Sequence, residues 1–268
     1  MLKSKKLTGL LLVIVGISLI LGGCSGGEEQ TKLEEIKEKG KIVLGTAADY
    51  PPYEFHKEID GEDKIVGFDI EIAKEIAADL GVELEIKDMK FNGLLAALKA
   101  GNIDFIIAGM VPTEERAKNV DFSVPYYAAE QKLLIKAEKS GNYQKMTDLD
   151  GMKIGAQKAT VQQEIAEKKI EASDYKFLSK ITDLVLELKN DKVGGIVLVK
   201  PVAQSYAQAN EDLAVADLSL GKEDGIAVAV DKGNKELLNN INSSLEKLLK
   251  ENKIAEFISD ATKLAEVN

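Results

Sequence analysis

The sequence predicts an α/β protein with mostly parallel sheets, and three observations support this class. Short apolar runs such as Ile42–Gly45 and Gly195–Val199 are typical of buried strands. Segments with apolar residues at helical spacing, such as Phe68–Leu80, occur between such runs. The two kinds of segment alternate through both halves of the chain, which favours strands joined by helices.

The first half begins this alternation. Its predicted elements are the strands Ile42–Gly45, Val82–Ile86 and Ile103–Ala108 and the helices Phe68–Leu80 and Leu94–Ala100. Gly101 is expected to stop the second helix. We expect the carboxylate of Asp69 to face the free N–H groups in the first turn of its own helix.

The second half repeats the pattern. Its predicted strands are Lys132–Ala137, Lys153–Ala156, Gly195–Val199 and Gly225–Val230, and its predicted helices are Val161–Lys169, Thr182–Leu188, Pro201–Ala207 and Glu236–Leu249. A short helix is expected after the last of these. Pro201 suits the first turn of its helix, where its missing N–H costs nothing.

Composition excludes several kinds of site. The 268 residues include one His and one Cys, so neither a disulfide nor a Cys/His metal cluster is available. The formal net charge of -10 would repel a phosphate backbone. We therefore predict no nucleic-acid partner, no cofactor and no metal.

The N-terminus has the layout of a secretion signal. Three lysines precede the uncharged apolar stretch Leu7–Leu21, which ends in Gly22-Gly23-Cys24. This resembles the bacterial lipobox, which implies removal of residues 1–23 as a signal peptide and diacylglycerol on Cys24, with residues 24–32 as a flexible tether. Two acyl chains suffice for stable anchoring. The alternative is an uncleaved membrane anchor with an incidental Cys.

The first candidate binding segment, Thr46–Phe55, follows the first strand. It contains two prolines and three aromatic residues, Tyr50 among them. Aromatic rings on a stiff loop at the end of a strand can form an apolar wall for a ligand. The alternative is that these rings pack into the core.

The second candidate segment runs from Phe91 to Arg116. Lys and Arg together number 35, and Arg116 is the only arginine among them. A single Arg among many lysines suggests a position where a planar, two-pronged donor is needed, as in gripping a carboxylate. Exposed N–H groups at Gly109 could assist. The alternative is a structural salt bridge of Arg116 with Glu114 or Asp121.

The third candidate segment, Gly155–Gln162, is predicted as a strand, a turn and the start of a helix. A helix N-terminus presents free N–H groups and a positive dipole, and therefore suits an anion. The alternative is that Thr160 acts only as an N-cap.

Taken together, these segments resemble the polar amino-acid branch of the type II periplasmic binding proteins, the solute receptors of ABC importers also described as bacterial solute-binding protein family 3. The resemblance covers about Leu33 to the C-terminus. Its further markers, in this order, are Gly67-Phe68-Asp69-Ile70, Thr113-Glu114-Glu115-Arg116, Asp121–Tyr127, Lys200-Pro201-Val202-Ala203 and Asp224–Val228.

The resemblance implies two α/β lobes joined by two hinge crossings. Lobe 1 would comprise residues 33–125 and 224–268, and lobe 2 residues 131–220. The hinge would pass through residues 126–130 and 221–223. A solute would bind in the cleft between the lobes, and cleft closure would enclose it.

The resemblance also assigns ligand-binding roles. Tyr50 and Phe91 would sandwich the ligand side chain. Its carboxylate would be held by Arg116, by the backbone at Gly109 and Val111, and by the N–H groups of Ala159 and Thr160.

Two positions depart from the family pattern. Val111 stands where relatives often have Ser or Thr. Val199 stands where relatives usually have an acid that pairs with the ligand's α-ammonium, an interaction worth about 1.5–3 kcal/mol. Either another acid such as Asp49 or Glu54 takes this role, or the amine of the ligand is blocked, displaced or absent.

The function implied is that of a monomeric, non-enzymatic binding lipoprotein on the outer face of the cell membrane. It would bind a small carboxylate-bearing solute, most simply a polar amino acid or a derivative, and pass it to an ABC permease. One alternative is an extracytoplasmic sensor or adaptor of the same fold. The other is a dehydratase-like enzyme, although no Ser/His/Asp constellation is evident.

Overall fold

The structure, a computed structural model, describes residues 30–266. The predicted signal peptide and Cys24 lie outside the described residues. Residues 31–266 belong to one compact unit. Its first helix, α1 (Lys32–Lys39), begins with a capping box in which Thr31 and Glu34 bond each other's backbone N–H. The predicted tether therefore ends earlier than residue 32.

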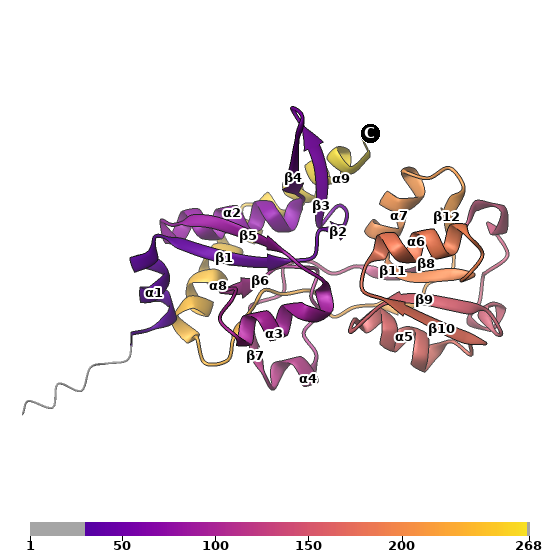
Figure 1. Ribbon diagram of the computed structural model, residues 1–268, viewed down its shortest axis with the longest axis horizontal. Coiled ribbons are helices and arrows are strands. Elements are labelled where there is room, and N and C mark those ends of the chain that lie inside the picture. The colour runs from indigo at the N-terminus through magenta and orange to yellow at the C-terminus, as the bar shows by residue number, and fades with distance from the viewer. Residues whose placement is uncertain (1–29, 267–268) are drawn as a thin grey trace, which may run out of the picture. The chain divides into compact units, whose positions relative to one another are not determined.

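The first sheet has the strand order β5-β1-β6-β14-β7. Its strands are β1 (Lys41–Thr46), β5 (Glu83–Asp88), β6 (Phe105–Ile106), β7 (Val120–Phe122) and β14 (Ala229–Asp231). β14 runs opposite to the other four. Helices α2 (Phe68–Leu80) and α3 (Leu94–Lys99) both pack on β1, from opposite sides of the sheet (Figure 1).

The second sheet has the order β10-β9-β11-β8-β12, with β13 also pairing β8. Its strands are β8 (Glu130–Lys136), β9 (Lys153–Gln157), β10 (Asp174–Leu178), β11 (Gly195–Val199), β12 (Leu213–Val215) and β13 (Gly221–Lys222). β8 runs opposite to the others. Helices α5 (Val161–Lys169) and α6 (Ile181–Lys189) pack on β9 from its two sides (Figure 1).

Three further helices complete the layers. α7 (Lys200–Gln208) packs on the second sheet, and α8 (Lys235–Lys250) and α9 (Lys253–Glu266) pack on α2. Short helices occur at α4 (Glu114–Ala117), η1 (Phe91–Gly93), η2 (Ala137–Lys139) and η3 (Met146–Leu149). Within the described part of the chain, no helix is both long and apolar enough to span a membrane.

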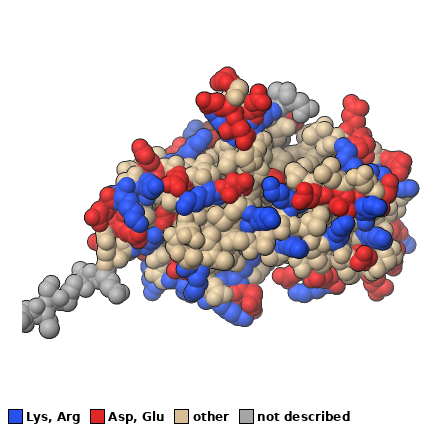
Figure 2. Space-filling view, viewed as in Figure 1, with Lys and Arg blue, Asp and Glu red and all other residues tan. Residues whose placement is uncertain are grey.

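A small third sheet, β2-β3-β4, extends from the first lobe. It consists of β2 (Asp49–Tyr50), β3 (Glu54–Ile59) and β4 (Glu62–Val66). Acidic side chains gather at the tip of the β3–β4 hairpin, whereas elsewhere on this face both signs of charge are interspersed (Figure 2). β2, which pairs with β3 at the base of this sheet, contains Tyr50.

The chain crosses between the two large sheets twice. One crossing leads from β7 to β8, and the other from β13 to β14. Tyr127 and Ile226 pair as an isolated antiparallel bridge between the two crossings. Together with the two sheets, this arrangement confirms the predicted two-lobed α/β fold.

Three predicted elements differ from those observed. The ladder of β6 covers only two residues of the predicted strand Ile103–Ala108. Only the end of the predicted strand Gly225–Val230 lies in β14, because Ile226 bonds Tyr127 and Ala227 bonds Met110 in the crossing region. The helix expected to be short at the C-terminus, α9, has 14 residues, since its apolar face packs on α2 and α7.

Candidate functional site

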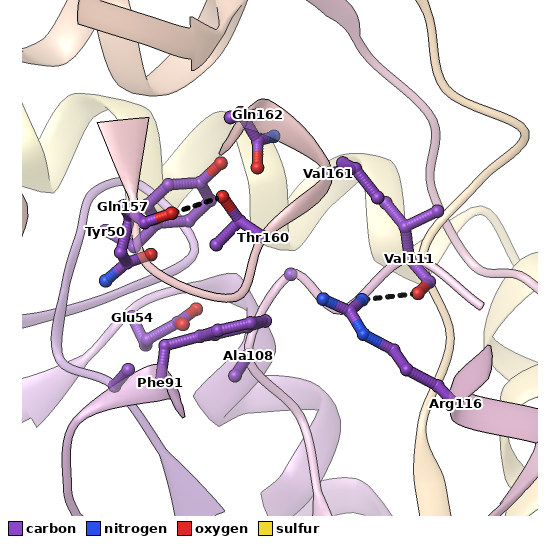
Figure 3. Close-up of a pocket in the computed structure, with 12 residues that line it drawn as sticks. Tyr50, Glu54, Phe91, Ala108, Val111, Arg116, Gln157, Thr160, Val161 and Gln162 are labelled. Carbon is purple, nitrogen blue, oxygen red and sulfur yellow. Dashed lines mark hydrogen bonds between the residues drawn. The ribbon is translucent and has the colours of Figure 1, made fainter. Parts of the chain in front are cut away.

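A pocket lies where the carboxyl ends of β1, β6 and β9 face one another, the usual ligand position in open α/β sheets. Its free volume in this structure is about 10 Å³, about the space of one water molecule, so the two lobes lie close together over the pocket. Residues from both lobes line it (Figure 3): Ala47, Tyr50, Glu54, Phe91, Ala108, Gly109, Val111, Arg116, Gln157, Thr160, Val161 and Gln162.

Tyr50 forms one wall of the pocket. Its ring centroid lies 5.1 Å from that of Tyr53, which in turn lies 4.4 Å from Phe68. Gly109 adopts a φ of +54°, and a Cβ there would come within 3.1 Å of the Tyr50 ring. Glycine at this position therefore allows the backbone to approach the tyrosine. Tyr50 both lines the pocket and packs into the core, so the two sequence-based alternatives coexist.

Arg116 lies against the ring of Phe91. The guanidinium carbon is 5.4 Å from the ring centroid, within range of a cation–π interaction. Nη1 donates to the carbonyl of Val111 at 2.6 Å, and Nη2 donates to the carbonyl of Ala159 at 2.8 Å. Burial lowers the pKa of Arg116 to about 10, so the side chain stays charged at neutral pH. The second bond links the two lobes.

The guanidinium has no acidic partner within the described residues. Asp121, which sequence reasoning offered as one, pairs instead with Lys232 at 2.6 Å. Arginine has five N–H donors, of which two are bonded to carbonyls here. Arg116 therefore presents a buried positive charge with unused donors to the pocket, which favours a ligand carboxylate.

The N-terminus of α5 faces Arg116 from the second lobe. The Thr160 hydroxyl accepts from the N–H of Gln163 and donates to the carbonyl of Gln157, so it is an N-cap that also lines the pocket. The N–H of Ala159 is bonded to the Gln163 side chain. The first N–H groups of the helix that follow, at Val161 and Gln162, have no intrahelical partner.

The Glu54 carboxyl lies at the end of the pocket away from Arg116 (Figure 3). Glu54 is 1% exposed, no N–H or hydroxyl group donates to its oxygens among the described residues, and its carboxyl interacts with that of Asp69. Burial, together with the charge of Asp69, raises the pKa of Glu54 well above its ordinary value. A buried carboxyl with a raised pKa that lines a pocket is a candidate for a functional role.

The Asp69 carboxylate, next to Glu54, is fixed by two hydrogen bonds. It accepts from the N–H of Gly109 at 3.0 Å and from the hydroxyl of Tyr126 at 2.9 Å. The prediction that it would face the N–H groups of its own helix is wrong, because these tertiary donors are better placed. Burial raises its pKa to about 6, and these two donors oppose that rise. The N–H of Gly109, predicted to hold the ligand carboxylate, is thus already bonded to Asp69.

Val199 and Asp49 lie outside the pocket lining. Val199 ends β11, is 2% exposed and lies behind Tyr50, whose side chain contacts its backbone. The Asp49 carboxylate accepts from the N–H of Ile181 at the start of α6, and its carbonyl accepts from the Tyr206 hydroxyl. Asp49 therefore connects the two lobes beside the pocket.

Sequence reasoning missed a chain of polar side chains behind α5. The Gln162 amide donates to Gln131, and the Gln131 amide donates to Glu223. Gln162 lies within a segment that the sequence had singled out, and Glu223 lies within the predicted hinge. Their connection depends on the pairing of β8 with β11 and β13, which no local pattern shows.

Comparison with known proteins agrees with this geometry. Residues 42–260 match the profile of the bacterial extracellular solute-binding proteins, family 3. The chain belongs to this family. It is therefore a solute-binding protein of an extracytoplasmic class, which confirms the family, fold and general function predicted from its motifs.

Individual relatives are binding proteins for amino acids. The arginine-binding extracellular protein ArtP of Bacillus subtilis is 36% identical, over 89% of this chain and 91% of its own. A probable histidine-binding protein of Campylobacter jejuni is 31% identical, over 90% of this chain and 92% of its own. The amino acid ABC transporter substrate-binding protein AbpA from Streptococcus pneumoniae, in its crystal structure bound to L-arginine, is 39% identical in sequence. The match has a TM-score of 0.85 and covers 88% of this chain and 100% of AbpA.

Proposed function

We propose that this chain is the solute receptor of an ABC importer for an amino acid with a cationic side chain, most simply L-arginine. Arg116 holds the ligand carboxylate, assisted by Thr160 and the start of α5. Tyr50 and Phe91 flank the ligand side chain, and Val111 contacts it without a hydroxyl. Glu54 receives the distal cation.

The opposite polarity of the two pocket ends carries this proposal. In Figure 3 the Phe91 ring lies between the Arg116 guanidinium and the Glu54 carboxyl. A ligand with a carboxylate at one end and a guanidinium at the other complements both ends. Its cation lowers the pKa of Glu54 on approach, so that the carboxyl releases its proton and accepts charge-assisted hydrogen bonds. The names of the relatives support the same ligand.

The two lobes act as the moving parts of this receptor. We place their boundaries at residues 33–125 with 224–268 for lobe 1 and at residues 131–220 for lobe 2, with the hinge at 126–130 and 221–223. The contacts of Arg116 and Asp49 with the second lobe belong to the closed arrangement. A ligand that contacts both lobes favours this arrangement by its differential affinity.

The receptor works as a monomer attached to the outer face of the cell membrane. Lipidation at Cys24 accounts for the attachment and rests on the sequence around that residue. The anchor keeps the receptor near its permease. Globomycin treatment of expressing cells, or Cys24→Ala, is expected to prevent maturation and release the protein from the membrane fraction. Unchanged membrane retention of the Cys24→Ala variant would contradict lipidation.

Calorimetry with L-arginine and with L-citrulline, its neutral isostere, tests the ligand assignment. Wild-type protein is expected to prefer arginine, and Glu54→Gln is expected to lose about 1.5–3 kcal/mol of arginine binding with little change for citrulline. Glu58→Gln on the exposed part of the same strand is the matched control. Equal affinity for the two ligands in wild-type protein would exclude the cationic-ligand assignment.

A wider screen covers the general function. Arginine, lysine, histidine, small peptides and organic acids are added singly in a thermal-shift assay. A true ligand at 100 times its dissociation constant stabilises by about 2.7 kcal/mol. If no carboxylate compound shifts the transition, the receptor assignment itself is wrong.

A further inference from the structure

Val199, at the position where an acid was expected, lies behind Tyr50, and a polar side chain lies directly beside it. In the antiparallel ladder of β11 and β8, Val199 pairs with Gln131. Side chains of directly paired residues project from the same face of a sheet. The Gln131 side chain, which is 1% exposed, thus lies next to the apolar side chain of Val199.

Gln131 belongs to a short hydrogen-bonded relay. Its Nε2 donates to Oε2 of Glu223 at 3.0 Å, and its Oε1 accepts from Nε2 of Gln162 at 3.1 Å. The other oxygen of Glu223 accepts from the N–H of Ala129 at 3.0 Å. The relay therefore runs from the hinge crossing, through β8, to the first turn of α5.

Both oxygens of Glu223 accept hydrogen bonds in the structure, from the N–H of Ala129 and from Nε2 of Gln131. Burial raises the pKa of Glu223 to about 7, and above that pH its carboxylate can only accept, so Gln131 offers its NH₂ to Glu223 and its oxygen to Gln162. Gln162 must in turn offer its NH₂ to Gln131. Its own oxygen is then left to face away from the relay.

That oxygen faces the pocket. Gln162 lines the pocket, and Figure 3 shows its amide oxygen directed towards the side that Tyr50 and Thr160 form. Among the described residues this oxygen has no hydrogen bond, whereas Nε2 is bonded to Gln131. An oriented amide oxygen backed by a carboxylate is a suitable acceptor for an ammonium group.

We propose that the relay from Glu223 through Gln131 to Gln162 replaces the acid missing at Val199 and recognises the α-ammonium group of the ligand. Glu223 and Gln131 are positioning residues, and Gln162 is the residue that contacts the ligand. This inference rests on the proposed function, because it requires an α-amino acid whose carboxylate is held by Arg116.

A pair of ligands isolates this contact. L-Arginine and 5-guanidinopentanoic acid share the carboxylate and the guanidinium and differ only in the α-ammonium. Calorimetry is expected to show that wild-type protein prefers arginine by about tenfold to 100-fold, the usual value of a hydrogen bond to a charged group.

Glu223→Gln reverses the relay. The new amide must keep its oxygen towards the N–H of Ala129, so its NH₂ faces Gln131. The Gln131 and Gln162 amides then turn over, and Gln162 presents NH₂ to the pocket. The preference for arginine is expected to fall below about threefold, as a donor replaces an acceptor. An effect on hinge stability alone would weaken both ligands equally and leave the ratio unchanged.

Two further variants complete the test. Gln162→Leu removes the acceptor without touching the hinge and is expected to abolish the preference even if Glu223→Gln fails to fold. Glu130→Gln is the matched control, because Glu130 carries a nearby carboxylate that pairs with Lys132 outside the relay. The control is expected to keep the wild-type ratio.

The outcomes separate the two proposals. Equal binding of both ligands by wild-type protein, or an unchanged ratio in Gln162→Leu, overturns the relay and leaves the carboxylate and guanidinium assignments intact. Failure of wild-type protein to bind either ligand overturns the proposed function and the relay together.

Discussion

The two walls of the pocket differ in the chemical groups that they offer to a ligand. The first lobe contributes two aromatic rings, a guanidinium and a buried carboxyl, namely Tyr50, Phe91, Arg116 and Glu54. The second lobe contributes neutral groups at the start of one helix, from Gln157 to Gln162. Most of the charge that distinguishes one solute from another therefore lies on one wall, while the other wall supplies oriented dipoles.

This difference follows from what each lobe can stabilise. The charged groups of the first lobe are held by interior contacts, such as those of Asp69 with Gly109 and Tyr126. The helix N-terminus of the second lobe needs no charged residue, because its N–H groups and dipole already attract anions. The first wall should consequently determine ligand identity, and the second should contribute affinity.

Removal of Arg116 is expected to have the largest effect. Arg116→Ala deletes the charge for the carboxylate and the bond to Ala159, and a truncation of this kind typically costs about 2–5 kcal/mol of binding. Calorimetry with arginine measures the loss. Lys118→Ala, which removes an exposed cation two residues further along the chain, serves as the control. Unchanged affinity in Arg116→Ala would show that the first wall does not hold the carboxylate.

The buried acids are expected to make the ligand-free protein more stable at low pH. Burial raises the pKa of Asp49 and Asp69 to about 6 and that of Glu223 to about 7, and it raises the pKa of Glu54 well above its ordinary value. Between about pH 4 and pH 7 the folded state thus binds more protons than the unfolded state. The free energy of unfolding falls as pH rises, by about 1.4 kcal/mol per pH unit for each proton.

Thermal unfolding between pH 5 and pH 8 without ligand checks this dependence. The melting temperature is expected to be highest near pH 5, and Glu54→Gln is expected to flatten the slope. The surface acids that pair with lysines, such as Asp121, have lowered pKa values, so their protonation changes the free energy of unfolding only at lower pH. A melting temperature that rises steadily to pH 8 would show that the first wall does not hold protonated carboxyls.

The smallest effect is expected from the caps of two helices. Thr160→Ala and Thr31→Ala each remove a Thr N-cap and should each cost about 1 kcal/mol of stability. Only Thr160 lines the pocket, so only Thr160→Ala should also lower the affinity for arginine, by severalfold. Chemical denaturation and calorimetry measure the two quantities. Equal ligand affinity in both variants would limit the second wall to a structural role.

Much of the fold was predictable where local pattern and tertiary packing agree. The predicted bounds of Phe68–Leu80, Val161–Lys169 and Gly195–Val199 coincide with α2, α5 and β11. In the two helices the apolar residues recur at helical spacing and form the buried face. In the strand every residue is buried, as its continuous apolar run predicts. The prediction was less accurate for Gly225–Val230, because an apolar run does not reveal that part of it crosses between two sheets.

The candidate site was predictable where residue type is unusual. Arg116 stood out as the only arginine, and Tyr50 as an aromatic beside two prolines. Glu54 was considered for the amine, but its burial beside Asp69 was not visible, since it depends on how the hairpin packs on α2. The role of Gln131 depends on strand register, which local sequence does not determine. Neither Glu54 nor Gln131 can be assigned a role from the sequence alone, because each role depends on neighbours that are distant in the chain.

The cluster of rings near the hinge has a practical consequence for spectroscopy. The chain has seven tyrosines and no tryptophan, and Tyr50, Tyr53 and Tyr127 are neighbours, with the last two rings 6.0 Å apart. Tyr50 lines the pocket and Tyr127 lies in a crossing between the sheets. Tyrosine emission, which tryptophan would otherwise dominate, thus originates partly from the pocket wall and the adjoining crossing between the sheets. The unlabelled protein carries its own optical reporter for stopped-flow measurements of solute capture.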